Sequence, residues 1–403
     1  MEHRLVKGIE AALGWNGPGL LGGAFARGSI SDPGLIERIF TTNKLLDTVM
    51  RRSVTVPQLR CFRGGEELHP NAFVSAEVNR RGQSIPMANM LRLGALLREG
   101  CTLVLDEANV FDPAMEVACR ALQWWSRERV QVNMYLTTQD ASGFDLHWDD
   151  HDVVVVQLEG EKAWEVRGVS RPAPMYRDAA RNDDPSEQIV WSGVMRAGDV
   201  MHIPRGYWHQ ATRNGKGGGQ SLHMTFGFTK RTGVSWLTWL ADWSREHELF
   251  RHDLDRWGTA EQREMQADQL RQAAQALIAA RPVGGFLTTR ELDEPAARHV
   301  PFLEIFGPLR EVVCVTQFPP LIDEHGESVE VLAAGTKLTF AAKTLPALRL
   351  LLSGRPVMLA DAALSVGAEV ERMAEILIEE GLCASVTVEL SSGYTGLVAN
   401  AAC

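Results

Sequence analysis

Short β-branched runs broken by turn residues fill the chain between about residues 53 and 230, and this pattern most limits the folds open to it. The runs are CTLVLDEAN, VQVNMYLTT, DVVVVQLEGEKAWEV, AGDVMHIPRGYWHQAT and SLHMTFGFT. One helical segment, AMEVACRALQWWSRE, interrupts them. Many short strands without alternating long helices favour an antiparallel sandwich or barrel over a parallel α/β sheet.

The remaining sequence is mainly helical in pattern. Residues 1–52 contain glycine-rich coil and one predicted helix, LIERIFTTNKLLDTVMRR. Residues 231–282 show a helical period with a tryptophan-rich face that must bury against something, such as another subunit. Residues 283–403 mix helices with a closing VTVEL and SSGYTG pair, which resembles a small winged-helix module. A chain of 403 residues is longer than one hydrophobic core usually spans. We therefore predict four parts, at residues 1–52, 53–230, 231–282 and 283–403.

Composition narrows the classes of partner. The formal net charge of -10 argues against nucleic acid, because phosphate binding depends on clustered Lys and Arg. No segment approaches the roughly twenty apolar residues of a membrane helix. The N-terminal sequence lacks the pattern of a secretory signal, so we expect a soluble protein in the cytoplasm. The six cysteines form no C-x-x-C pair, which suits reduced thiols.

The stretch GFDLHWDDHDVVVVQLEGEKAWEV at residues 143–166 places charged side chains beside an apolar run. Charges are expensive to bury unless something pairs with them. Alternate residues of an extended chain share a face, so we expect His147 and Asp149 to point the same way. A cation at that point would pair with the Asp149 carboxylate. His151 falls on the same face and either contacts the site or is exposed.

A third ligand is available in the later segment GDVMHIPRGYWH, which ends at His209. Its turn residues, Gly198-Asp199 and Pro204-Arg205-Gly206, can bring this segment back beside the first strand. Two histidines and one carboxylate form the facial triad of non-heme Fe(II) oxygenases, which leaves one face of the metal open. His202 is expected to be packed or hydrogen-bonded; if it pointed inward, copper would compete with iron.

Three motifs occur in a fixed order: H-x-D, Q-x-E-G-E-K-x-W and G-D-x-x-x-I-P-R-G-x-x-H. With them, residues 53–230 resemble the JmjC/cupin-type domain of the ribosomal oxygenase group of 2-oxoglutarate-dependent protein hydroxylases. The tail resembles that family's C-terminal half. The resemblance implies a mainly β fold with helices: a double-stranded β-helix (jelly-roll) core, a helical dimerisation region and a C-terminal winged-helix-like domain.

Site residues follow from the resemblance position by position. His147, Asp149 and His209 match the family's iron ligands, and Asn133 matches a pocket asparagine near the co-substrate. Lys162 sits where the family places a basic residue against the distal carboxylate of 2-oxoglutarate. The residues alone also support this role, because a lysine inside an apolar strand is placed to donate a charge-assisted hydrogen bond to an anion. The alternative is that its side chain reaches solvent, since Gly160 lies close by.

In the segment SLHMTFGF, every second residue from Ser221 to Thr225 is polar, so these three side chains share one face of the strand. Ser221, His223 and Thr225 therefore either line the pocket or fill the core. We name Thr225 as a candidate for co-substrate binding.

The resemblance implies Fe(II), 2-oxoglutarate and O2 as cofactors and no catalytic acid or base beyond the metal ligands. The expected reaction is hydroxylation of an amino-acid side chain, the β-carbon of histidine or arginine, in a protein or peptide. The expected substrate is a ribosomal protein or a ribosomally made natural-product precursor. We expect the enzyme to be a homodimer.

Two other functions stay open. The first is a cupin metalloenzyme that uses the same ligands, with another metal such as copper and without 2-oxoglutarate, which Lys162 argues against. The second is a non-catalytic metal-binding regulator, which the intact His147, Asp149 and His209 argue against. Lysine demethylation fits less well, because the ribosomal oxygenase pattern is matched over most of the chain.

Overall fold

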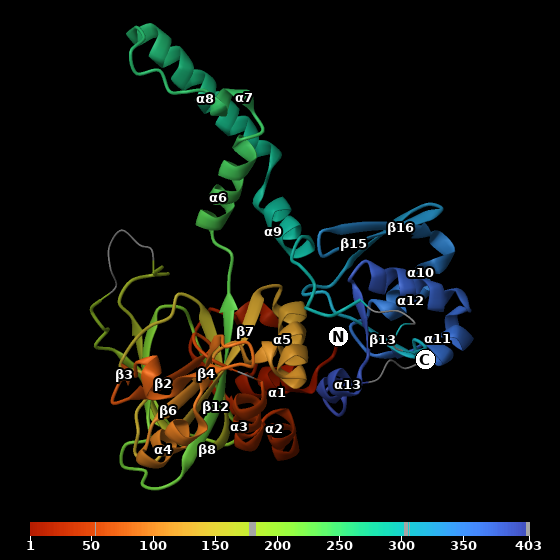
Figure 1. Ribbon diagram of the computed structural model, residues 1–403. Helices are drawn as coiled ribbons and strands as arrows, with labels where there is room; N and C mark the ends of the chain where they lie inside the picture. The colour runs from red at the N-terminus through yellow and green to blue at the C-terminus, as the bar shows by residue number, and fades with distance from the viewer. Residues whose placement is uncertain (53, 177–182, 302–304, 306, 400–403) are drawn as a thin grey trace. The chain divides into compact units, whose positions relative to one another are not determined.

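The computed structural model describes residues 1–52, 54–176, 183–301, 305 and 307–399. The chain divides into two compact units (Figure 1). Unit 1 comprises Met1–Thr229, His299–Val315 and Pro346–Cys403, and unit 2 comprises Lys230–Arg298 and Thr316–Leu345. The four-part division expected from the sequence stays a prediction.

An antiparallel sheet dominates unit 1. In sheet order its strands are β1 (Ala26–Ser29), β10 (Asp199–Ile203), β8 (Asp152–Val169), β12 (Gln220–Thr229), β7 (Arg129–Thr138), β6 (Thr102–Leu105), β2 (Leu59–Arg63) and β3 (Glu66–Glu67). Two further strands, β9 (Ile189–Arg196) and β11 (Tyr207–Thr212), pair with β8 off this path. A separate hairpin, β4 (Val74–Val78) and β5 (Ser84–Ala88), precedes helix α4 (Met90–Glu99).

Strand β8 belongs to both halves of the barrel. Its first half pairs with β10 and β12, and its second half pairs with β9 and β11. Gly160 lies between the halves with φ +64°, a backbone conformation that favours glycine. A Cβ there would lie 2.0 Å from the carbonyl oxygen of Gln220, so the bend requires glycine. This arrangement confirms the expected double-stranded β-helix.

Helices cover the outer face of the main sheet. They are α1 (Arg4–Leu13), α2 (Pro33–Ile39), α3 (Thr42–Arg51) and α5 (Pro113–Ser126) (Figure 1). Their apolar faces form one core with Val132 and Met134 of β7 and Leu222 and Met224 of β12, which alternate with the residues that face the inside of the barrel. The single helix predicted over residues 35–52 is wrong, because Phe40 is extended and the Thr41 side chain caps a new helix by accepting from the Lys44 N–H.

The C-terminal part of unit 1 packs on this helical layer. It contains β13 (Glu311–Cys314), β17 (Val357–Met358), α11 (Leu359–Val366), α12 (Glu369–Glu379), β18 (Cys383–Ser385) and α13 (Val388–Tyr394). The closing segment VTVEL contains the start of α13, which the Thr387 side chain caps. The buried Arg120 guanidinium of α5 donates to the Tyr394 hydroxyl at 2.7 Å, which ties α13 to the helices over the barrel.

Unit 2 consists of helices and a three-stranded sheet. Its elements are α6 (Gly233–Ser244), α7 (Glu248–Arg251), α8 (Ala260–Ala280), α9 (Val283–Leu292), β14 (Leu321–His325), β15 (Ser328–Ala333) and β16 (Thr336–Ala341), and α10 (Leu345–Leu351) begins at its boundary. Trp239, Leu240, Leu277 and Phe286 form its small helical core. Leu277 is the only buried residue of the 21-residue helix α8.

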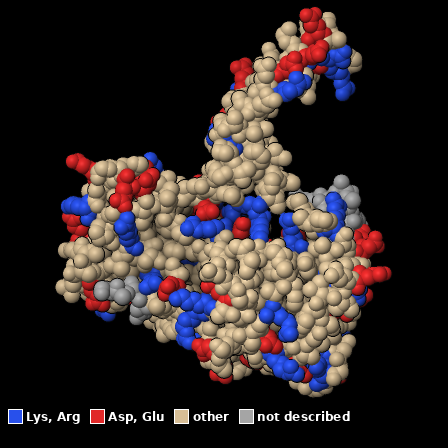
Figure 2. All heavy atoms as spheres, turned by 180° about the vertical axis from the view of Figure 1, so that it is seen from behind, with Lys and Arg blue, Asp and Glu red and all other residues tan. Residues whose placement is uncertain are grey.

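Among the described residues, none of the helices is long and apolar enough to cross a bilayer. The cysteines at positions 61, 101, 119, 314 and 383 are buried and form no disulfide with one another, and Cys403 lies outside the described residues. Figure 2 shows acidic and basic side chains mixed over one face, without an extended area of either sign.

Candidate metal centre and its cavity

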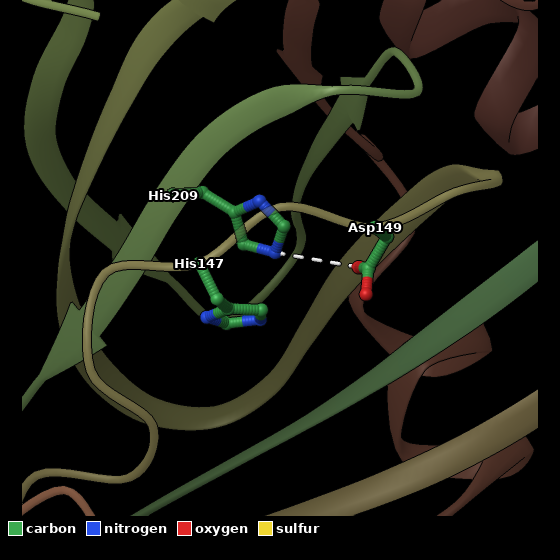
Figure 3. A group of neighbouring side chains, drawn as sticks. All are labelled: His147, Asp149 and His209. Atoms are coloured by element: carbon green, nitrogen blue, oxygen red, sulfur yellow. Dashed lines mark ion pairs between the residues drawn. The ribbon is translucent and has the colours of Figure 1, made fainter. Parts of the chain in front are cut away.

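The structure brings the three candidate metal ligands together (Figure 3). His147 and Asp149 lie in the irregular segment before β8, and His209 lies on β11. Backbone hydrogen bonds in both directions join residues 147 and 209 at 3.1 and 2.7 Å. One ligand atom from each of the three side chains lies within 4.8 Å of the others. A metal ion fits at the point that these atoms share.

Backbone carbonyls orient both imidazoles. The Nδ1 atom of His147 lies 2.7 Å from the Asp145 carbonyl oxygen, and that of His209 lies 3.1 Å from the Tyr207 carbonyl oxygen. If each Nδ1 carries the proton and donates it, each Nε2 keeps its lone pair for a metal. The Nε2 atom of His209 lies 3.5 Å from the Asp149 carboxylate.

The electrostatics of the site suit a cation. Burial opposes ionisation of Asp149, yet His209, His151 and His147, with a hydrogen bond from Tyr176, hold its pKa below the usual range. Burial, and then His147, lower the pKa of His209. A carboxylate that stays charged and an imidazole that stays neutral are the forms that bind divalent metals.

These ligands open into a cavity of about 300 Å³ inside the barrel. Its wall contains all the side chains named from the sequence as metal or co-substrate ligands: His147, Asp149, His209, Lys162, Asn133 and Thr225. Apolar surface comes from Val153, Val155, Trp164 and Phe144. The cavity is large enough for a small organic acid beside a metal ion.

Lys162 is buried in the cavity wall with 2% of its surface exposed. Its ammonium donates to the Thr137 hydroxyl at 2.9 Å. Burial, and then the charge of Arg213, lower the pKa of Lys162 to about 7. The lysine does not reach solvent, so it is placed to meet an anion that enters the cavity.

Cross-strand pairs between β7 and β12 supply the polar wall. Asn133 lies opposite Thr225 and Tyr135 opposite His223. The next pair, Thr137 opposite Ser221, is fully buried and is not among the described residues that line the cavity. Since alternate residues of a strand share a face, these pairs lie in a row along the same side of the sheet. The amide oxygen of Asn133 accepts from the Glu107 N–H at 2.9 Å, which fixes the side chain at the cavity edge.

Two other histidines have structural surroundings. His202 is fully buried on β10, where its Nε2 accepts from the Gly22 N–H at 3.2 Å and its Nδ1 lies 3.0 Å from the Ala24 carbonyl oxygen. It therefore packs and forms hydrogen bonds, as expected. The Nδ1 atom of His151 lies 3.4 Å from the Asp150 carboxylate, and His151 is not one of the described residues that line the cavity.

Several cavity residues were not identified from the sequence. Tyr135 shares a strand face with Asn133, so the period of two could have identified it. Tyr176 carries no such signal. Its hydroxyl reaches the Asp149 carboxylate at 3.3 Å from an irregular segment more than twenty residues away in the chain. Arg60 and Asp106 also line the cavity and form an ion pair at 3.4 Å.

Comparison with known proteins agrees with this architecture. The JmjC domain family matches residues 108–235, which include every candidate ligand. Residues 108–235 are therefore similar to a JmjC domain. It is 31% identical over 151 residues to the bifunctional lysine-specific demethylase and histidyl-hydroxylase NO66 of Drosophila sechellia, covering 37% of this chain and 22% of that protein. The NO66 protein of Caenorhabditis briggsae is 31% identical over 168 residues, with 40% and 20% covered.

Solved structures extend the likeness beyond the JmjC domain. Escherichia coli YcfD shares the fold with a TM-score of 0.56 at 17% identity, over 95% of this chain and all of that chain. A structure of YcfD, a ribosomal oxygenase, in complex with cobalt and 2-oxoglutarate gives a TM-score of 0.54 over 86% and 90% of the two chains. The chain therefore shares the fold of YcfD, and it spans only about a fifth of the length of the NO66 relatives.

Proposed function

We propose that the protein is an Fe(II)- and 2-oxoglutarate-dependent oxygenase that hydroxylates an amino-acid side chain in a protein or peptide. The observation that carries the proposal is the two-histidine, one-carboxylate cluster in a JmjC cavity that also holds a buried lysine. We expect the reaction to take place in the cytoplasm.

The donor set fits iron. Two imidazole nitrogens and one carboxylate, all from one side, leave positions open for further ligands. The same donors bind copper, so the native metal is part of the proposal. With Fe(II), O2 and 2-oxoglutarate bound, the site supplies oxidative chemistry that hydroxylates an unactivated C–H bond and releases succinate and CO2.

The cavity also fits 2-oxoglutarate. The Lys162 ammonium is buried and would pair with the carboxylate remote from the metal. Thr225 and Asn133 lie opposite each other in the wall and would contact the same molecule. Burial of Lys162 keeps water from its ammonium. This pairing favours the 2-oxoglutarate chemistry over that of a cupin without an acidic co-substrate.

The names of the relatives support a histidine or arginine side chain as the target. The NO66 relatives are named as histidyl-hydroxylases and YcfD as a ribosomal oxygenase. We therefore propose the β-carbon of histidine or arginine, in a ribosomal protein or a ribosomally made peptide.

We propose further that two copies associate through the helices of unit 2. Large apolar side chains of α8 and of the segment before it are exposed: Met265 of α8 at 56%, and Trp257 and Leu254, between α7 and α8, at 89% and 74%. A helix of 21 residues with one buried side chain gains little stability from its own unit. A second copy of the same surface would bury these groups symmetrically.

The first test is anaerobic addition of Fe(II) and 2-oxoglutarate while the visible metal-to-ligand charge-transfer band is recorded. We expect a band in the wild type and in H252A, which removes an exposed imidazole of unit 2. H147A should show no band, and K162A should need far more 2-oxoglutarate. The oxygenase proposal fails if the wild type gives no band.

A further inference from the structure

The turn at residues 204–206 contacts the segment that carries the ligand Asp149. This turn leads from β10, which pairs with the first half of β8, to β11, which carries His209. The Gly206 N–H donates to the Asp149 carbonyl oxygen at 2.9 Å. Together with the hydrogen bonds between residues 147 and 209, this contact fixes the backbone of Asp149 relative to His209, whose imidazole faces the Asp149 carboxylate in Figure 3.

A buried carboxylate holds this turn in place. Asp152, the first residue of β8, is 3% exposed, and its Oδ1 accepts from the Arg205 N–H at 2.8 Å. Hydrogen bonds from a backbone N–H to a carboxylate are among the stronger ones in proteins. Asp152 is not one of the described residues that line the cavity. Its contact with Arg205 therefore links it to the metal centre through the turn.

Gly206 also supports the second contact of Asp149. Its φ is +82°, and a Cβ there would lie 2.5 Å from Cδ of Pro174. Glycine is therefore what allows the Pro174 ring to pack on the turn. Two residues after Pro174, the Tyr176 hydroxyl reaches the Asp149 carboxylate at 3.3 Å. The turn thus supports both the backbone and the side chain of Asp149.

We infer that Asp152 is a positioning residue for the metal centre, because it fixes the turn that holds the Asp149 carboxylate toward His209. This inference rests on the proposed function, since it requires a metal ion at the three ligands. Asp152 itself contacts neither the metal nor the co-substrate. Loss of its carboxylate leaves the Arg205 N–H without this acceptor and lets the turn move, so the orientation of Asp149 is no longer fixed. Groups that orient metal ligands in this way are typically worth 10–100-fold in metal affinity.

Two measurements test this role: anaerobic Fe(II) titration, and the visible spectrum of the protein loaded with Co(II), which reports the geometry of the ligands. D152A removes the acceptor, and D152N keeps an oxygen that can accept from the same N–H. D112A is the matched control. The Asp112 carboxylate is also buried and accepts from a backbone N–H, that of Met115 at 3.0 Å, but Asp112 is not among the described residues that line the cavity.

A second pair of variants tests the same turn while Asp152 stays in place. G206A adds a Cβ against the Pro174 ring, whereas G215A adds one at φ +75° with nothing within 4 Å. Both place alanine in a left-handed conformation, so the difference between them isolates the contact with Pro174. We expect G206A to bind Fe(II) at least about tenfold more weakly than G215A.

We expect D152A to bind Fe(II) about 10- to 100-fold more weakly and to change the Co(II) spectrum, with D152N within about threefold of the wild type. D112A should lose stability in denaturant unfolding and keep the wild-type metal affinity and spectrum. Wild-type affinity in D152A, or an equal loss in D112A, overturns the role of Asp152, while the wild-type 2-oxoglutarate band keeps the oxygenase proposal intact. If D152A does not fold, equal affinity in G206A and G215A overturns it. A wild type that binds neither metal overturns both proposals.

Discussion

The barrel of unit 1 buries ionisable side chains, whereas the helical part of unit 2 exposes large apolar ones. In the barrel, Lys162, His209 and His223 are almost completely buried. In unit 2, Leu254 and Trp257, in the segment between α7 and α8, are largely exposed. Buried ionisable groups and exposed large apolar groups both cost free energy unless a partner covers or pairs with them.

This contrast shows what kind of partner each region lacks. Three convergent ligand atoms and a buried ammonium need a cation and a small anion, which fit in a cavity of about 300 Å³. The exposed tryptophan and leucine side chains between α7 and α8 would be covered by an apolar protein surface, which the proposed dimer supplies. The polar cavity of the barrel thus supports a catalytic role, and the exposed apolar surface of unit 2 supports a role in association.

The largest effect is expected at the metal ligands. D149A removes the one carboxylate of the cluster and should weaken Fe(II) binding at least about a hundredfold, because it removes a direct ligand where even supporting partners are worth 10–100-fold. The neighbouring variant D150A removes a carboxylate that contacts His151 and should bind Fe(II) like the wild type. Metal titration compares the two, and equal affinity in both variants would contradict the site.

Association should break at the helices of unit 2. The double variant L254D/W257D places two charges on the exposed apolar surface and should convert dimer to monomer in light scattering, with the 2-oxoglutarate band retained. L91D, which changes a leucine that is 86% exposed in unit 1, is the matched control and should remain dimeric. A wild type that is monomeric at all concentrations rules out the dimer.

Replacing the buried lysine should raise stability and lower function. K162M removes a buried charge and should increase the free energy of unfolding by about 2 kcal/mol at pH 6. The pKa of Lys162 falls from its ordinary value in the unfolded chain to about 7 on folding, so the unfolded chain binds more protons above pH 7. Wild-type stability therefore rises with pH from 7 toward 10.5 relative to K162M, and the advantage of the variant shrinks.

Denaturant unfolding at pH 6 and 9 measures this difference. The same lysine should make wild-type affinity for 2-oxoglutarate decrease above pH 7, as the ammonium of the free protein loses its proton, and K162M should lack that slope. A variant less stable than wild type at pH 6 would show that Lys162 packs as a structural residue.

The smallest effect is expected from Tyr176. Y176F removes the hydroxyl that reaches the Asp149 carboxylate at 3.3 Å and should weaken Fe(II) binding by about two- to fivefold, the value of one exposed hydrogen bond. Burial, and then Asp149, raise the pKa of Tyr176, so the hydroxyl stays protonated at neutral pH. A loss as large as that in D149A would make Tyr176 part of the metal site itself.

Much of the barrel was predictable because its signals are local. The apolar run Val153–Val156, the turn at Gly198-Asp199 and the alternation in β12 specify strands without reference to the rest of the chain. The expected fold class is confirmed. The approach of His147 to His209 was predictable from motif order, although His147 and Asp149 lie in an irregular segment rather than inside a strand.

Other features depend on contacts that the sequence does not display. Whether His223 filled the core or lined a cavity depended on the facing residues Tyr135 and Trp164. The segment VTVEL has β-branched residues, but Thr387 caps a helix that packs against α5, and tertiary contact overrides propensity. Tyr176 comes from a segment whose sequence gives no period at all.

The length of strand β8 has a consequence for the size of acid that the cavity can accept. Asp149 leads directly into this strand, and Lys162 lies on it just beyond the Gly160 bend. The length of the strand therefore sets the distance between the metal site at Asp149, where a 2-oxo acid would be chelated, and the Lys162 ammonium, which would pair with its other end. Lengthening or shortening β8 by two residues, which preserves the inward face, would shift the preferred chain length of the acid rather than abolish binding.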